Sequence, residues 1–176
     1  EFADILVREV DRLNQVLEDF LRFARQTPVE RGSFDLNGVV REVLDLTRRQ
    51  AERSDVAVIV TLGELPLLTG DGGQLRQALL NLVLNALQAM PEGGRLSVTT
   101  RRSHDRAEVT VADSGPGIPA GEEARIFRTF VTTRADGTGL GLPISQRIVV
   151  SHGGQITVQS SPGQGAAFTI ALPLPT

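Results

Sequence analysis

Two glycine clusters, and the acidic residue that opens the first of them, are the residues best suited to chemistry in this sequence. The first cluster reads D-S-G-P-G-I-P from Asp113 to Pro119, and the second reads G-T-G-L-G-L from Gly137 to Leu142. Glycine adopts positive φ angles and lets the backbone approach a ligand closely. The second cluster runs into an apolar, helix-like segment, and a glycine loop at a helix N-terminus turns amide N–H groups toward an anion. It therefore predicts a phosphate cradle, whereas the first predicts a turn that presents the Asp113 carboxylate to a donor such as a purine amino group.

Asn81 and Asn85 form a second chemical signal, on a segment whose apolar pattern predicts a helix over residues 75–90. A spacing of four places both carboxamides on one helical face. Asparagine is a poor helix former and is costly to bury without hydrogen bonds. The simpler interpretation is two solvent-facing residues, but their apolar neighbours leave little solvent face: Leu82, Val83, Leu84 and Ala86. Neutral oxygen donors beside a phosphate cradle suit Mg²⁺, which prefers oxygen ligands and retains phosphates and waters in its shell.

The composition limits the classes of function. The 176 residues suffice for one domain with an appendage, and an apolar fraction of 40% is ordinary for a globular core. A net charge of −3 argues against a nucleic-acid surface, and the scattered basic residues argue against binding to anionic lipid. The lack of cysteine excludes disulfides, thiolate metal sites and cysteine nucleophiles.

No apolar run approaches the ~20 residues that span a bilayer, and no signal peptide is visible. We therefore expect a soluble, cytoplasmic chain without contact to a membrane. Because the sequence begins at Glu1 and not at methionine, we also expect a fragment of a longer protein, whose membrane attachment the sequence leaves open.

Residues 2–25 are predicted to form one long helix with an unbroken heptad seam, made of Ala3, Leu6, Val10, Leu13, Leu17, Phe20 and Ala24. Such a stripe needs a partner surface. One interpretation is a helix packed on its own domain; the other, which the unbroken heptad favours, is one helix of a dimeric bundle. Pro28 ends the helix, since the residue before proline is biased away from the helical region. We place the domain boundary in the linker that follows, with domains at residues 1–30 and 34–176.

The second domain is predicted to alternate helices with hairpins. Asn37 is the expected N-cap of its first helix, and residues 66–73 are expected to be a turn. The predicted helices cover residues 38–53, 75–90 and 140–150, and the predicted strands cover residues 56–62, 95–102, 107–113, 155–160 and 166–172. This order describes an α+β fold or an α/β sandwich.

Four motifs in this order resemble those of sensor histidine kinases. The block N-L-V-L-N-A-L-Q-A-M (Asn81 to Met90) resembles their N-box, and D-S-G-P-G-I-P resembles their G1 box. The block I-F-R-T-F-V-T-T-R (Ile126 to Arg134) resembles their F-box and the start of the ATP lid, and G-T-G-L-G-L resembles their G2 box. Four motifs in the right order and spacing are far more specific than a single Gly-x-Gly. The stretches N-A-L-Q-A-M and F-V-T-T-R within these motifs are most similar to nitrogen-regulation-type kinases.

The resemblance covers residues 34–173 and implies the ATP-binding domain of the gyrase, Hsp90, histidine kinase and MutL superfamily. The implied fold is α+β, a two-layer α/β sandwich of the Bergerat type with a mixed sheet packed on helices. The helix over residues 2–25 is similar to the second helix of the dimerisation and phosphotransfer bundle. A homodimer through that helix is therefore expected.

The resemblance also implies roles for single residues. Asp113 would accept from the adenine amino group, on a turn shaped by Gly115, Gly117 and Ile118. Asn85 would hold Mg²⁺, and Asn81 would act beside it near the phosphates. The lid would begin at Thr132, Thr133 and Arg134, with Arg134 as a catalytic cation. The triphosphate would be wrapped by Gly137, Thr138, Gly139, Leu140, Gly141 and Leu142, and Thr169 would support the adenine pocket through water.

Two departures from the family's pattern stand out. Many members carry lysine and then tyrosine where Gln88 and Ala89 stand here, so Gln88 would face ATP without a charge and Arg134 would supply the cation. The phosphoacceptor motif, a histidine followed by an acidic residue, an apolar residue and arginine, is missing. His104 is expected in an exposed hairpin turn and His152 at a helix C-terminus, where histidine is an ordinary cap.

The implied function is transfer of the γ-phosphoryl group of ATP to a histidine on a bundle helix absent from this chain, for relay to an aspartate of a response regulator. ATP and Mg²⁺ are the implied cofactors. One alternative is an ATPase of the same superfamily, although those enzymes use glutamate as the base where Asn81 stands. Another is a nucleotide-binding dimerisation module without catalysis.

Overall fold

The computed structural model describes residues 28–132 and 137–175, together with Val10 and Leu21. The predicted helix over residues 2–25 therefore lies otherwise outside the described residues, as do Thr133 and Arg134 of the predicted lid.

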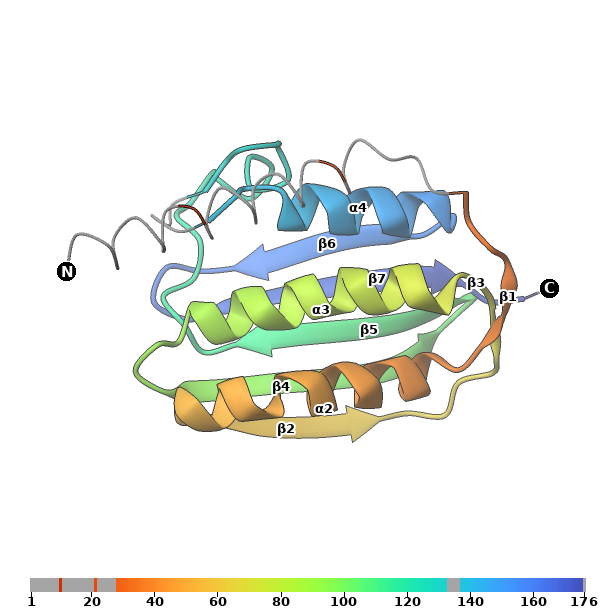
Figure 1. Cartoon of the computed structure of the whole chain (residues 1–176), viewed down its shortest axis with the longest axis horizontal. Helices are drawn as coiled ribbons and strands as arrows, with labels where there is room; N and C mark the ends of the chain where they lie inside the picture. The colour runs from red at the N-terminus through yellow and green to blue at the C-terminus, as the bar shows by residue number, and fades with distance from the viewer. Residues whose placement is uncertain (1–9, 11–20, 22–27, 133–136, 176) are drawn as a thin grey trace.

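A five-stranded mixed sheet, covered on one face by three helices, forms the described domain (Figure 1). The helices are α2 (Leu36–Arg53), α3 (Gly72–Gln88) and α4 (Gly141–Ser151). The strands of the sheet, in spatial order, are β2 (Val56–Leu62), β4 (Gly94–Ser103), β5 (Arg106–Asp113), β7 (Ala166–Pro173) and β6 (Gln155–Ser160). Strand β2 runs parallel to β4, and the other neighbouring pairs are antiparallel. This arrangement confirms the predicted two-layer α/β sandwich.

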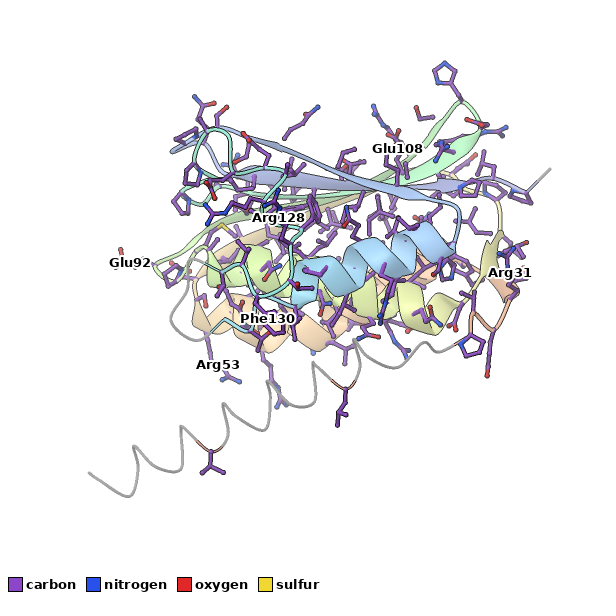
Figure 2. The ribbon with its side chains drawn as sticks, turned by 90° about the horizontal axis from the view of Figure 1, so that it is seen from above. Arg31, Arg53, Glu92, Glu108, Arg128 and Phe130 are labelled. Carbon is purple, nitrogen blue, oxygen red and sulfur yellow. The ribbon has the colours of Figure 1, made fainter. Side chains whose placement is uncertain are left out.

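Side chains of the central strands alternate between a buried face and an open face. The buried face packs under the helices and includes Leu96 and Val98 of β4, Val109 and Val111 of β5, and Phe168 and Ile170 of β7. The open face carries small and polar side chains, and Glu108 lies on this side, away from the helices, in Figure 2. One row across it is threonine on every strand, in the order Thr61, Thr99, Thr110, Thr169 and Thr157.

Helix α3 lies between α2 and α4 in the helical layer (Figure 1). This central position explains its high apolar content, because it contacts a helix on each side and the sheet beneath. Its buried residues are Leu75, Ala78, Leu79, Leu82, Val83, Ala86 and Leu87. Asn81 and Asn85 are half-buried on the remaining part of its surface. Among the described helices, none combines the length and the apolar character needed to cross a bilayer.

The start of α2 differs from the prediction. Asp35, not Asn37, is the N-cap, and its carboxylate accepts a hydrogen bond from the Asn37 backbone N–H at 2.9 Å. The Asn37 side chain points inward instead, where its amide donates to the Gly63 carbonyl at 2.9 Å and its oxygen accepts from the Thr100 hydroxyl at 2.7 Å. Its tertiary hydrogen bonds therefore override its capping propensity.

Two short strands were not predicted. Strand β1 (Gly32–Phe34) pairs antiparallel with β3 (Leu68–Gly70) within segments expected to be a linker and a turn. The chain before β1 is also bound to the domain, since the Glu30 N–H donates to the Asp71 carboxylate at 3.4 Å and the Pro28 carbonyl accepts from the Gln74 amide at 3.4 Å. The predicted linker therefore contacts the N-terminal end of α3.

Candidate functional site

Three segments that carry the predicted site residues lie at the same side of the domain. They are the C-terminal half of α3, the first turn of α4 and the end of β5 (Figure 1). Helices α3 and α4 run in opposite directions, so the end of the one meets the beginning of the other. The fold thus brings Asn81, Asn85, Asp113 and Gly141, which are up to 60 positions apart in sequence, to one edge.

Asn81 ties α3 to the beginning of α4. Its amide nitrogen lies 3.1 Å from the Gly141 carbonyl oxygen and 3.3 Å from the Ser145 hydroxyl. Ser145 is fully buried, and its hydroxyl also lies within hydrogen-bond distance of the Ala78 and Gly141 carbonyls, at 3.2 and 3.0 Å. Sequence reasoning missed Ser145, although a serine inside an apolar helical pattern is a signal of an internal hydrogen bond.

Asn85 lies one turn beyond Asn81 and is half-buried. Its carboxamide has no hydrogen-bond partner within the described residues, so its oxygen is available to a ligand. No group of three His, Asp or Glu side chains that could hold a metal ion exists in the described part of the chain. A neutral amide oxygen fits Mg²⁺ under these conditions, because phosphates and waters supply most of the shell of this ion.

Asp113 is the last residue of β5 and is half-buried. Its Oδ1 accepts hydrogen bonds from the backbone N–H groups of Gly115, at 2.9 Å, and Ala166, at 3.3 Å. Burial raises the pKa of this carboxyl above its ordinary value, and these N–H groups oppose the rise only in part. In the described part of the chain Oδ2 accepts no hydrogen bond from another residue, which leaves one charged acceptor for a ligand donor.

The N-terminus of α4 offers uncapped amides. Helices α2 and α3 begin with aspartate side chains that cap their first N–H groups, at Asp35 and Asp71. Helix α4 begins after Leu140 without any side-chain cap. Uncapped N–H groups at the positive end of a helix dipole bind anions. The predicted phosphate cradle therefore coincides with the one described α-helix of the three whose N-terminus has no side-chain cap.

The glycines of the loop before α4 differ in how closely they contact their neighbours. Gly139 has a φ of +67°, and a Cβ there would lie 2.7 Å from the Phe130 Cα. The Gly139 carbonyl also accepts from the Phe130 N–H at 3.0 Å, so the loop packs backbone to backbone on the F-box. A Cβ on Gly141 would meet the Asn81 side chain only at ordinary contact distances, the nearest being 3.8 Å to Cγ. Leu140 is fully buried and Leu142 packs against the core, so only their backbones could meet a phosphate.

The remaining predicted residues lie as follows. Gln88 is exposed at the end of α3, on the helical face of Asn81 and Asn85, and Thr132 is exposed. The Thr138 hydroxyl accepts from the Leu140 N–H at 3.4 Å. Gly137 is half-exposed, just before this turn. Thr133 and Arg134 lie outside the described residues, so their predicted roles stay predictions.

The predicted role of Thr169 stays a prediction. Thr169 lies in the threonine row on the open face of the sheet, where its hydroxyl is 2.9 Å from that of Thr110. The strand alternation directs it away from the helices, whereas the residue of β7 that contacts the Asp113 carboxylate is Ala166.

A shallow hollow borders Asp113 on the open face of the sheet. Its walls come from the ends of β5 and β6, the β6–β7 turn and the start of β7: Ala112, Gln159, Ser160, Ser161, Gln164, Gly165, Ala166 and Ala167. They include neither Asn81 nor Asn85 nor any residue of the loop before α4. The converging motif residues therefore define the candidate site, on the helical side, and this hollow does not.

Comparison with known proteins agrees with this geometry. The family model described as "Histidine kinase-, DNA gyrase B-, and HSP90-like ATPase" matches residues 70–176. The chain belongs to this family. It is 38% identical over 175 residues to the sensor histidine kinase ZraS of Escherichia coli strain K12, which covers 99% of this chain and 38% of that relative. The chain thus spans less than two fifths of the length of a curated relative that it matches.

Solved structures of histidine kinases share the fold. Full-length ShkA in complex with AMPPNP superposes with a TM-score of 0.88 at 33% identity, covering 99% of this chain and 38% of that one. The catalytic domain of histidine kinase ThkA, in a nucleotide-free form, gives 0.76 at 33% identity, covering 82% of this chain and 96% of that one. ThkA in complex with the response regulator protein TrrA gives 0.84 at 28% identity, covering 99% and 51%. The predicted kinship with sensor histidine kinases and the predicted ATP-binding catalytic domain are confirmed.

Proposed function

We propose that this chain is the catalytic part of a sensor histidine kinase that transfers the γ-phosphoryl group of ATP to a histidine supplied from outside this sequence. The observation that carries the proposal is the convergence of Asp113, the asparagine pair of α3 and the uncapped start of α4 at one edge of the domain. Phosphoryl transfer relies mainly on positioning and charge neutralisation, and these groups supply both.

Each group has one task in this proposal. The free Oδ2 of Asp113 accepts from the adenine amino group, a charge-assisted hydrogen bond that guanine could not donate at the same position. The amides that begin α4 bind phosphate oxygens. Asn85 would hold Mg²⁺, which supplies positive charge to the phosphates when bound. Asn81 maintains the distance between α3 and the phosphate loop through Gly141 and Ser145.

Neither histidine of the sequence suits the role of phosphoacceptor. His152 is buried, with Nε2 2.9 Å from the Asp71 N–H donor nitrogen and Nδ1 2.7 Å from the Ile148 carbonyl. His104 is exposed at the β4–β5 hairpin turn with a φ of +54°, at the opposite end of β5 from Asp113. The proposed acceptor therefore belongs to a phosphotransfer helix that pairs with residues 2–25 in a homodimeric bundle.

The proposed receiver of the phosphoryl group is an aspartate of a response regulator. The similarity to ThkA, which was solved together with such a protein, supports this partner. Because the substrate is ATP, we also propose a cytoplasmic position for the domain, whether or not the parent protein is anchored in a membrane.

The alternative of a superfamily ATPase needs a base at position 81. The Asn81 amide is not basic, and its NH₂ group is already engaged with Gly141 and Ser145. The structure therefore supports the kinase over the ATPase. The third possibility, a nucleotide-binding dimerisation module without catalysis, is distinguished from the two enzymes by the following experiment.

The test mixes the chain with radiolabelled Mg-ATP and a separately made acceptor helix from a related kinase. Label on the histidine supports the kinase, steady phosphate release supports the ATPase, and neither supports the binding module. Asp113→Asn is the matched control, since loss of one charge-assisted hydrogen bond costs about 1.5–3 kcal/mol, roughly ten- to over a hundredfold in ATP affinity. Unchanged affinity in a folded Asp113→Asn variant would contradict the adenine assignment.

A further inference from the structure

We propose that Ser160 is a positioning residue for nucleotide recognition, which sets the Asp113 carboxylate and the glycine turn after it through the β6–β7 turn. The inference rests on the proposed function, because it concerns the base end of the same ATP site. Ser160 is not part of the four motifs, and it ends strand β6.

The Ser160 hydroxyl uses both of its hydrogen-bonding capacities. Its Oγ accepts from the Ile118 backbone N–H at 2.8 Å and donates to the Gly165 carbonyl oxygen at 2.7 Å. Ile118 belongs to the G1 turn and Gly165 to the β6–β7 turn, so one side chain connects two loops that are distant in sequence. Ser160 is half-buried, and both of its partners are backbone groups that would otherwise need water.

The first residue of β7, directly after the β6–β7 turn, contacts the Asp113 carboxylate. Ser160 pairs with Ala166 in the sheet register, and the Ala166 N–H donates to the Asp113 Oδ1 at 3.3 Å. A second contact between the loops is the Gly163 N–H, which donates to the Pro116 carbonyl at 2.7 Å. The orientation of the carboxylate thus depends on the position of a turn that Ser160 holds.

Glycines let the backbones of the two turns pack directly against each other. A Cβ on Gly117 would overlap the Ser161 carbonyl oxygen, and a Cβ on Gly165 would overlap the Asp113 carbonyl oxygen. Both residues have positive φ, +74° and +81°. Because the backbones touch directly, a shift of the β6–β7 turn moves the G1 turn with it. Loss of the Ser160 hydroxyl should therefore displace the Asp113 carboxylate, the proposed adenine-binding group, and leave the loop before α4 unchanged.

The experiment compares Ser160→Ala with Ser160→Thr, which keeps the hydroxyl, and with Thr157→Ala, which removes an exposed hydroxyl from the same strand. Affinities for ATP, ADP and GTP are measured by calorimetry on the full chain, together with thermal unfolding. We expect Ser160→Ala to weaken ATP and ADP equally, by about tenfold, the effect of one lost hydrogen bond. The preference for ATP over GTP should fall, Ser160→Thr should restore it, and Thr157→Ala should match the wild type.

Equal loss for ATP and ADP places the effect at the base, and the changed base preference is a readout that a merely structural role would not move. A folded Ser160→Ala chain with wild-type ATP affinity and an unchanged ATP-to-GTP ratio overturns the inference, even if its unfolding temperature is lower. If Ser160→Ala does not fold, Ser160→Cys gives the decision, because a thiol of similar size is a weak hydrogen-bonding group and should lose part of the preference. If the wild-type chain itself binds no ATP, the proposed function fails, and not this inference alone.

Discussion

Asp113 combines a proposed role in ligand recognition with a cost to the folded state. The carboxylate is placed where burial disfavours its charge, and burial is the largest influence on its raised pKa. Two backbone N–H groups hold one of its oxygens, and no other residue of the described part donates to the second. Such a group is better explained by a ligand than by stability.

The first prediction concerns stability and pH without nucleotide. Because the pKa of Asp113 is higher in the folded chain than in the unfolded one, the ionised carboxylate destabilises the fold above that raised pKa. The penalty disappears as the pH falls toward the ordinary aspartate range, about pH 4. Asp113→Asn should therefore be at least as stable as the wild type at neutral pH, and the wild type should gain on the variant as the pH falls. Urea denaturation of both chains at several pH values measures this difference; a variant that is clearly less stable at neutral pH contradicts it.

Gly139 allows a second prediction at the residue scale, because its backbone lies against Phe130. Gly139→Ala adds a methyl group at 2.7 Å from the Phe130 Cα, so the loop before α4 must move. We expect ATP affinity to fall at least roughly tenfold, since small displacements of positioning groups have large effects.

Gly121→Ala is the control for Gly139→Ala. Gly121 also has a positive φ, +86°, but a Cβ there meets nothing within 4 Å. Both variants bear the conformational cost of alanine at positive φ, and only Gly139→Ala bears the steric overlap. Equal ATP affinities for the two variants, measured by titration of folded protein, would show that the Phe130 contact does not shape the phosphate loop.

At the scale of elements, the sequence was most informative where the apolar pattern was long. The strand over residues 56–62 and the β6–β7 hairpin were predicted nearly to the residue, and the helices to within a few residues. Helix α3 begins at Gly72 and not at Leu75, because its cap is Asp71, inside a segment read as a turn. Four motifs with fixed spacing were enough to predict which elements meet at the site.

The elements that sequence reasoning missed are those stabilised by distant partners. Strands β1 and β3 are three residues each and pair across more than 30 positions, so neither has a periodic pattern of its own. Asp35, not Asn37, caps α2, because the Asn37 side chain makes tertiary hydrogen bonds to Gly63 and Thr100. Ser160 acts through a single hydroxyl group at the end of a strand, and no local pattern distinguishes it from a surface serine.

His152 joins the ends of two elements and carries a third prediction. It caps α4, its Nε2 accepts the Asp71 N–H at the start of α3, and its ring fills the space that a side chain at Gly70 would need. His152→Ala should destabilise the domain by about 1–3 kcal/mol, because the Asp71 N–H loses its partner, with a further loss from the cavity. Chemical denaturation measures it, with His104→Asn as the control: His104 is exposed at positive φ, which asparagine tolerates, so its change should stay within about 0.5 kcal/mol. Equal effects of the two variants would contradict the linking role of His152.

At the scale of the whole molecule, the candidate site lies at one end of the domain and the segment that follows residue 27 lies at the other. Figure 2 shows Arg31, beside β1, at one end, and Glu92, just beyond α3, at the other. Helices α3 and α4 run the length between them, from the segment that follows Pro28 to the candidate ATP site. The contacts of Pro28 and Glu30 with the start of α3 therefore connect the approach to the predicted bundle helix with the elements that carry the candidate site.

The fourth prediction concerns the helix over residues 2–25, which should make the chain self-associate through its heptad seam. Val10, a seam residue that the structure describes, is 53% exposed, so more than half of this side chain is open to a partner. Each seam side chain contributes about 1.5–3 kcal/mol if a partner buries it fully.

The experiment compares the full chain with a chain that begins at Pro28, which keeps β1 and the contacts of the linker with α3. Sedimentation should show a dimer for the full chain and a monomer for the shorter one, with equal ATP affinity per protomer because all nucleotide motifs lie beyond residue 80. Monomers in both cases at high concentration would mean that the helix packs on its own domain, and the bundle interpretation would fail.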